Sequence, residues 1–113
     1  MHNHKRLRVY EDALDAAVAV YEYAKCLPDE ERFNLTDQTR RSAVSIPSNI
    51  AEGCGRSTDK DTARFLSNAI GSAYELETQL LIAQRLGYAD PGPLIPRLVA
   101  LQRQIVCFRR RLL

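Results

Sequence analysis

The chain has 113 residues, the size of one domain, with 45% hydrophobic and 27% charged residues, as is typical of soluble globular proteins. Its formal net charge of +2 does not by itself require a nucleic-acid partner. No apolar tract is long enough to span a bilayer, and no apolar run follows the basic residues 1–8 as a signal peptide requires. We therefore expect one cytoplasmic domain over residues 1–113, without a membrane partner, in which residues 1–8 form a flexible basic tail.

The first predicted helix spans residues 9–26 and ends before Pro28, because the residue that precedes a proline is pushed out of the helical region. Spacings of three and four predict its core stripe, which is Tyr10, Ala13, Leu14, Ala17, Tyr21 and Ala24.

The second predicted helix begins near Asn34 or Thr36 and ends near Gly53. It is apolar on two sides, with one stripe of Leu35, Ala43, Ile46 and Ile50 and another of Val44, Pro47 and Ala51. Because a proline inside a helix removes one backbone hydrogen bond and clashes with the preceding turn, we expect a kink at Pro47.

The third predicted helix is the longest, about 28 residues, from a Thr58 cap to a stop at Gly87. Its seam is Leu66, Ala69, Ala73, Leu76, Leu80 and Ala83, and four more apolar residues lie outside that seam, namely Phe65, Ile70, Leu81 and Ile82. Helices with more apolar surface than one face can bury need a second partner, so we expect the protein to associate with itself.

The fourth predicted helix starts with Pro93 at its first position and Pro96 at its fourth, where neither proline is disruptive. Its seam is Leu94, Leu98, Leu101, Ile105, Phe108 and Leu112. No segment alternates as a strand does. Four amphipathic helices joined by short loops predict an all-α protein, an antiparallel up-and-down four-helix bundle whose second helix is kinked at Pro47.

Catalytic machinery is not evident in the sequence. The only histidines are His2 and His4, in the expected tail, which leaves no rigid histidine for a catalytic triad or an inward-facing di-iron site. We expect no enzyme activity, no cofactor and no metal, with weak metal binding by the tail or an unrecognised enzyme as the remote alternative.

The three cysteines lack the spacing of a zinc site, and their odd number argues against a disulfide framework. We interpret Cys26, Cys54 and Cys107 as buried free thiols. Cys54 is the one most open to exposure, because glycines flank it.

Residues 45–56, SIPSNIAEGCGR, are the most unusual stretch of the chain. Asn49 and Glu52 are available to bond backbone groups freed by Pro47, and Glu52 and Arg56 have the favourable order for an ion pair one turn apart. We interpret Pro47, Asn49, Glu52, Gly53 and Arg56 as a structural motif that fixes the bend and end of the helix. A ligand site is the alternative.

A resemblance rests on several blocks of residues, in order: Arg40–Gly53, Gly55-Arg56, Arg64-Phe65-Leu66, Gly71-Ser72-Ala73 and Glu75–Leu80. Over roughly residues 9–88 the chain resembles the four-helix-bundle family named for proteins encoded in intervening sequences of bacterial 23S ribosomal RNA. Cys54 departs from the aromatic residue usual in that family. The resemblance implies a ring-like homopentamer and kinship to the accessory variability protein of diversity-generating retroelements, which works with a reverse transcriptase and RNA. It implies no catalytic residues.

Two basic clusters lie at the ends of the chain, Lys5, Arg6 and Arg8 at one and Arg109, Arg110 and Arg111 at the other. Repeated around an oligomer they would bind RNA or DNA phosphates, although the helix dipole alone also explains cations in a last turn. We expect a non-enzymatic, homo-oligomeric accessory or scaffold that contacts nucleic acid or a nucleic-acid enzyme. A protein-protein adaptor is the alternative.

Overall fold

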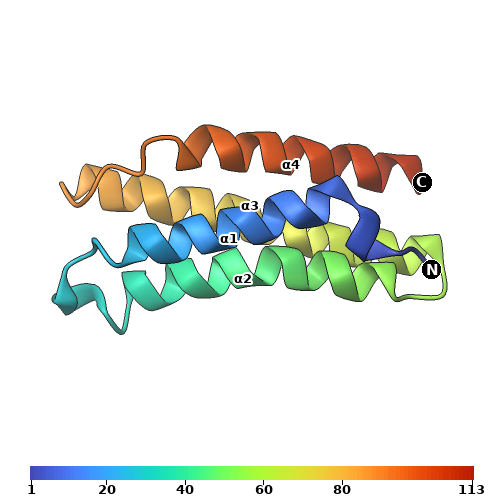
Figure 1. Ribbon diagram of the computed structural model, residues 1–113, viewed down its shortest axis with the longest axis horizontal. Coiled ribbons are helices and arrows are strands. Elements are labelled where there is room, and N and C mark those ends of the chain that lie inside the picture. The colour runs from blue at the N-terminus through green and yellow to red at the C-terminus, as the bar shows by residue number, and fades with distance from the viewer.

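Four α-helices carry the fold in the computed structural model, which describes residues 1–113: α1 (Arg8–Ala24), α2 (Leu35–Cys54), α3 (Asp59–Arg85) and α4 (Leu94–Arg111). Two short 3-10 helices, η1 (His4–Arg6) and η2 (Asp29–Glu31), precede α1 and α2. There are no strands, so the predicted all-α four-helix bundle is confirmed. In Figure 1 each helix runs back alongside the one before it, and both termini lie at one end.

The packing of the helices forms a closed square. Each helix packs on its neighbour in sequence, and α1 also packs on α4, whereas no Cα atoms lie within 8 Å of each other between α1 and α3 or between α2 and α4. The bundle measures 43 × 23 × 20 Å. The outer sides of α1 and α3 therefore face away from each other, on opposite edges of the bundle.

The helix boundaries follow local chemistry. The Thr58 hydroxyl accepts a hydrogen bond from the Asp61 amide at 3.1 Å, so the predicted cap of α3 is confirmed. Gly87 has a φ of 81°, and the next amide, that of Tyr88, donates to the Ala83 carbonyl, which closes the end of α3. Pro93 is the cap of α4 and not its first residue, which moves Pro96 to the third helical position.

The core side of α1 is the predicted one only in part, because Ala13 and Ala24 of the predicted stripe are buried but Leu14 and Tyr21 are not. Val9, Ala13, Ala16, Val20, Tyr23 and Ala24 are buried, whereas Leu14 and Tyr21 are 36% and 42% exposed. The prediction was wrong for these positions because α1 is apolar over two adjacent sides, and periodicity alone does not say which one faces the bundle. The predicted seams of α3 and α4 are buried except for the half-buried Leu112, and Phe65 and Ile70 of α3 join the buried residues.

The first residues, predicted to form a flexible tail, lie against the bundle in the structure, and their flexibility stays a prediction. The His2 amide donates to the Cys54 carbonyl at 2.8 Å, and the His2 ring packs edge-on against Phe108 with centroids 5.8 Å apart. Asn3 caps η1 by accepting from the Lys5 amide. The sequence did not reveal this because the partners of His2 lie on α2 and α4.

The prediction that the cysteines are buried is wrong for Cys26 and Cys107, and Cys54, which was thought the most open to exposure, is the buried one. Cys54 is fully buried, while Cys26 and Cys107 are exposed, and all three are free thiols. Burial raises the pKa of the Cys54 thiol, so this side chain is held in its unreactive protonated form.

Candidate functional site

The residue types that carry metal or acid-base chemistry are scattered in the fold. No group of three His, Cys, Asp or Glu side chains is placed to hold a metal ion. His2 lies 3.2 Å from the Asp59 carboxylate, and His4 packs on the Tyr10 ring, so the two histidines have separate partners. No helix is long and apolar enough to cross a membrane.

The unusual segment at residues 45–56 forms the contact between α2 and α3. The Ser45 and Ser72 hydroxyls lie 2.7 Å apart, and one turn earlier Ser42 donates to Glu75 at 3.2 Å. At Gly53 the helices approach so closely that a Cβ atom there would lie 2.8 Å from the Phe65 Cβ. Small residues on successive turns of α2 therefore let α2 and α3 approach closely, most of all at Gly53.

Pro47 lies inside α2, which is continuous from Leu35 to Cys54. The Asn49 side-chain amide donates to the Ser45 carbonyl at 2.8 Å and to the Ser45 hydroxyl at 3.0 Å. Asn49 thus bonds the backbone near the proline, but not the group that the proline frees, because a proline at position 47 leaves the Ala43 carbonyl without its donor. The kink itself stays a prediction.

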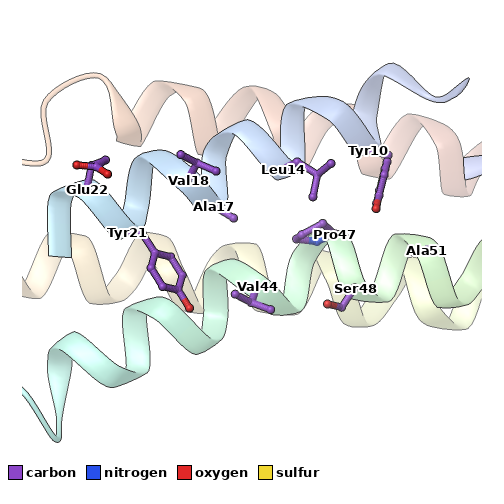
Figure 2. Close-up of a pocket in the computed structure, with 10 residues that line it drawn as sticks. All are labelled: Tyr10, Leu14, Ala17, Val18, Tyr21, Glu22, Val44, Pro47, Ser48 and Ala51. Carbon is purple, nitrogen blue, oxygen red and sulfur yellow. The ribbon is translucent and has the colours of Figure 1, made fainter. Parts of the chain in front are cut away.

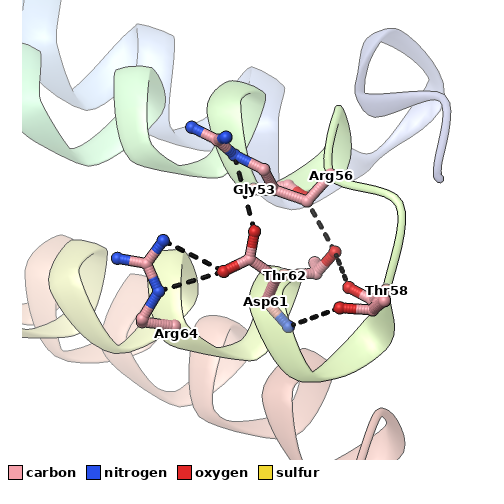
Figure 3. Close-up of polar contacts among 6 residues, drawn as sticks. All are labelled: Gly53, Arg56, Thr58, Asp61, Thr62 and Arg64. Atoms are coloured by element: carbon pink, nitrogen blue, oxygen red, sulfur yellow. Dashed lines mark hydrogen bonds and ion pairs between the residues drawn. The ribbon is translucent and has the colours of Figure 1, made fainter.

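Glu52 and Arg56 do not form the expected pair, because α2 ends at Cys54, before a further helical turn could bring them together. Glu52 is exposed, and the Arg56 guanidinium lies over the Phe65 ring at 4.4 Å and 3.9 Å from Asp61. Figure 3 shows Asp61 between Arg56 and Arg64, beside the Thr62 hydroxyl that donates to the Gly53 carbonyl at 2.7 Å. These contacts close the α2–α3 turn, and a ligand site in this segment stays the untested alternative.

The two predicted basic clusters lie at the same end of the bundle, although about 100 residues separate them in the chain. Residues 1–15, 45–72 and 103–113 make up this end (Figure 1) and contain ten Lys and Arg against six Asp and Glu. The remaining residues, at the other end, contain six Lys and Arg against eight Asp and Glu. The net charge of the chain is small, but it is positive at this end of the bundle and negative at the other.

A groove between the start of α1 and the end of α4 concentrates this charge. It encloses about 560 Å³, and we name it the basic groove; its lining residues are Leu7, Arg8, Val9, Arg103, Gln104, Cys107 and Arg111. Three arginines line it and no acidic residue does. Asp12, which lies 3.9 Å from Arg8, also accepts a hydrogen bond from Gln104 at 3.0 Å. The basic groove has the charge and the planar donors that suit phosphate oxygens.

Arg103 was missed by sequence reasoning, although Arg103, Cys107 and Arg111 recur every four residues on one helix face, which was an available signal. Of the predicted residues, Arg8 and Arg111 line the basic groove, while Lys5, Arg6 and Arg110 are exposed outside its lining. Arg109 faces α3, where it donates to the Ser67 hydroxyl at 3.1 Å.

A second groove, between α1 and α2, is apolar. It also encloses about 560 Å³, and we name it the apolar groove; its lining residues are Tyr10, Leu14, Ala17, Val18, Tyr21, Glu22, Val44, Pro47, Ser48 and Ala51. Figure 2 shows Tyr10 and Tyr21 extending from α1 at the two ends of the groove, with Val44 and Pro47 of α2 between them. Val18 and Val44 are 64% and 43% exposed. This side contains most of the stripe that periodicity assigned to the core of α1.

Comparison with known proteins places the chain in a family. A search of curated proteins found no similar sequence. Residues 5–104 match the model of the family described as 23S rRNA-intervening sequence protein. The matched range covers α1, α2, α3, most of η1 and more than half of α4, and leaves Arg109, Arg110 and Arg111 outside. The match does not extend to the accessory variability protein of diversity-generating retroelements, and that kinship stays a prediction. The four-helix bundle and this match over most of its length together show that the chain belongs to the 23S rRNA-intervening sequence protein family.

Proposed function

We propose that the protein is a non-enzymatic, homo-oligomeric helical scaffold that binds RNA or DNA phosphates at its basic end. The observation that carries the proposal is the basic groove, which Arg8 and Arg103 line from different helices; no acidic residue lines it, and the nearest carboxylate to Arg8 is that of Asp12 at 3.9 Å. Guanidinium groups donate planar pairs of hydrogen bonds that match phosphate oxygens.

In this proposal, the affinity for nucleic acid comes from repeating the basic end in every copy of the oligomer. One protomer has a net charge of only +2, and its basic end is partly offset by the acidic end. Copies held side by side with the same orientation would join their basic ends into one surface, so that each contact after the first forms within the complex. The cations are not interleaved with an aromatic stacking surface, so we expect little preference among sequences.

Phosphate binding is tested by titrating unrelated RNAs and DNAs at two salt concentrations. We expect Arg103→Ser with Arg111→Ser to weaken binding at least tenfold at low salt and to reduce the steepness of the salt dependence, because fewer counterions are released. The matched control is Arg32→Ser with Arg41→Ser, which removes the same charge from the other end of the bundle. Equal loss in both double variants would show that only net charge matters.

The adaptor alternative is an outcome of the same titration. A wild-type protein that binds no nucleic acid at low salt would favour a scaffold that contacts proteins alone. Contact with a nucleic-acid enzyme such as a reverse transcriptase, and a cytoplasmic location, complete the proposal and stay predictions.

A further inference from the structure

A small pocket lies where the chain turns from α1 to α2, at the end of the bundle opposite both termini (Figure 1). It encloses about 220 Å³, and we name it the turn pocket; its lining residues are Ala24, Lys25, Leu27, Pro28, Asp29, Arg32, Thr36 and Arg40. Three cations and one carboxylate line it, which leaves two positive charges in excess. The turn pocket is therefore a local exception at an end of the bundle that holds more acidic than basic residues.

Arg40 is the most informative residue of the turn pocket. Its Nε atom is buried and has no hydrogen-bond partner. The side chain is half-buried, and its guanidinium carbon lies 5.3 Å from the centre of the Tyr21 ring, which holds it at the contact between α1 and α2. A buried donor of a charged group is costly to leave without a partner, so its presence in a folded protein needs an explanation. A ligand in the pocket that Arg40 lines supplies one.

The carboxylates close by do not neutralise the two arginines of the turn pocket. Glu31 accepts hydrogen bonds from the Tyr88 hydroxyl at 2.9 Å and from the Leu35 amide at 3.3 Å. No carboxylate, including the one in the lining, lies within 4.0 Å of the side-chain nitrogens of Arg32 or Arg40. Both guanidinium groups are therefore available to an anion from solution.

Two further polar side chains complete the set of donors. The Lys25 ammonium lies 3.2 Å from Glu22, but these side chains are 66% and 67% exposed, and an exposed pair of this kind contributes little free energy. An anion can therefore replace Glu22 at small cost. Thr36 is buried and adds a hydroxyl, and it lies four residues before Arg40, on the same side of α2.

The size and charge of the turn pocket select its ligand. Pockets for drug-sized molecules enclose about 300–1,000 Å³, so this one suits a small ion or one group of a larger molecule. Two excess positive charges match a terminal phosphate group, which carries about −1.5 to −2 at pH 7 and only accepts hydrogen bonds. A carboxylate has a single charge. A phosphate within a nucleic-acid chain also has a single charge, and its chain continues on both sides, which does not suit so small a pocket.

We propose that the turn pocket binds a phosphate group, either free inorganic phosphate or the terminal phosphate of a small phosphorylated molecule. The buried Nε of Arg40 and the Thr36 hydroxyl donate to its oxygens, while Lys25 and Arg32 balance its charge. The bound group ties the connection between α1 and α2 to the first turns of α2. This site lies at the opposite end of the bundle from the basic groove, and it does not rest on the proposed function.

The experiment measures binding to the full chain by isothermal titration calorimetry, in a buffer without other oxyanions. The ligands are inorganic phosphate, glycerol 1-phosphate and acetate. Arg40→Gln and Lys25→Gln each remove one cation from the turn pocket. Arg41→Gln is the matched control, because Arg41 is the next residue of α2 but lies outside the lining and pairs with Asp37 at 3.0 Å.

We expect one phosphate to bind per chain with a Kd below about 1 mM. Arg40→Gln should weaken this binding at least about tenfold, because hydrogen bonds between charged groups are lost, and Lys25→Gln by about threefold. The affinity of the Arg41→Gln control should stay within about twofold of the wild type. Glycerol 1-phosphate that binds at least as tightly as phosphate assigns the pocket to a phosphorylated molecule, and weaker binding assigns it to free phosphate.

Urea denaturation with and without phosphate, at constant ionic strength, gives a second measurement and shows that each variant folds. A ligand that binds only the folded state raises the free energy of unfolding, so phosphate should raise it in the wild type and in Arg41→Gln, and less in Arg40→Gln. The variant Arg103→Ser with Arg111→Ser should bind phosphate as the wild type does, which separates the turn pocket from the basic groove.

Three results would overturn the inference. They are the absence of saturable binding by phosphate and its ester, an equal loss of binding in Arg40→Gln and Arg41→Gln, and acetate that binds as tightly as phosphate. If Arg40→Gln does not fold, Lys25→Gln and Arg32→Gln, which change exposed side chains, take its place. Each should then weaken phosphate binding more than Arg41→Gln does, and an equal effect would count against the turn pocket.

Discussion

The two sides of α2 are packed in opposite ways. Toward α3 it presents small residues, Ser42, Ser45, Asn49 and Gly53, and the serine and asparagine side chains find hydrogen-bond partners within the protomer. Toward α1 it presents Val44, Pro47 and Ala51, which face an open apolar groove. Directional polar contacts complete the first interface inside one chain, whereas the second leaves apolar surface exposed.

The largest expected effect is at the closest point of the α2–α3 contact. Gly53→Ala places a Cβ 2.8 Å from the Phe65 Cβ and 3.2 Å from the Thr62 carbonyl oxygen, and neither is the free end of a flexible side chain. We expect a loss of about 1–3 kcal/mol in the free energy of unfolding, measured by urea denaturation.

Gly71→Ala is the matched control for Gly53→Ala. It is a glycine within α3 that has nothing within 4 Å of the added Cβ. We expect it to stabilise the protein by about 0.5–1 kcal/mol, because alanine loses less backbone entropy in a helix. A similar gain at both glycines would contradict the close approach of α2 and α3.

Two tyrosines of α1 compare its inner and outer sides. The buried Tyr23 hydroxyl donates to the Ala89 carbonyl, whereas Tyr21 lies in the apolar groove. Tyr23→Phe leaves that carbonyl without its donor, and we expect a loss of about 1–2 kcal/mol by urea denaturation. Tyr21→Phe should change the free energy of unfolding by less than about 0.5 kcal/mol.

The same tyrosine predicts a pH dependence. Burial, followed by the nearby charge of Asp90, raises the pKa of Tyr23 above its ordinary value of 10.0. The folded state then holds the phenol proton more tightly than the unfolded state, so this stabilisation is fully present below pH 10.0 and is lost as the pH rises through the folded pKa. Unfolding measured above pH 10.0 should therefore depend less on pH in Tyr23→Phe. An unchanged dependence would exclude Tyr23 as its source.

A smaller effect is expected from the serine pair that joins α2 and α3. Ser45 and Ser72 are half-buried with their hydroxyls 2.7 Å apart. A double-mutant cycle with Ser45→Ala and Ser72→Ala should give a coupling free energy of about 0.5–1.5 kcal/mol. Additive losses would mean that the two hydroxyls do not depend on each other.

The smallest effect on the protomer is expected in the apolar groove. Val18→Ser and Val44→Ser, measured by urea denaturation at a protein concentration low enough for monomers, should each change the free energy of unfolding by less than about 0.5 kcal/mol. These side chains remain in water in a lone protomer, so their burial contributes only on assembly. A loss above 1 kcal/mol would show that this side is already a completed core.

Much of the fold could be predicted because the formation and the ends of a helix depend on residues that are close together in the sequence. The predicted ends of the helices lie within two residues of the observed ones, as the cap at Thr58 and the stop at Gly87 illustrate. The errors arose where two sides of a helix are equally apolar. In α1 the stripe that contains Leu14 and Tyr21 was assigned to the core, but it lines the groove, because only the neighbouring helices decide which side is covered.

In the candidate site too, some features depend on residues that are neighbours in the sequence and others on residues that only the fold brings together. The sequence by itself determined the helix count, the seams of α3 and α4, and the two basic clusters, because periodicity, capping and composition act within one or two helical turns. Only the tertiary structure decided that Arg8 lines the same groove as Arg103 and Arg111, that His2 contacts Phe108, and that Cys54 is buried while Cys107 is exposed. The physical reason is that these contacts join residues more than fifty positions apart, whose meeting depends on how the four helices pack together and not on any local pattern.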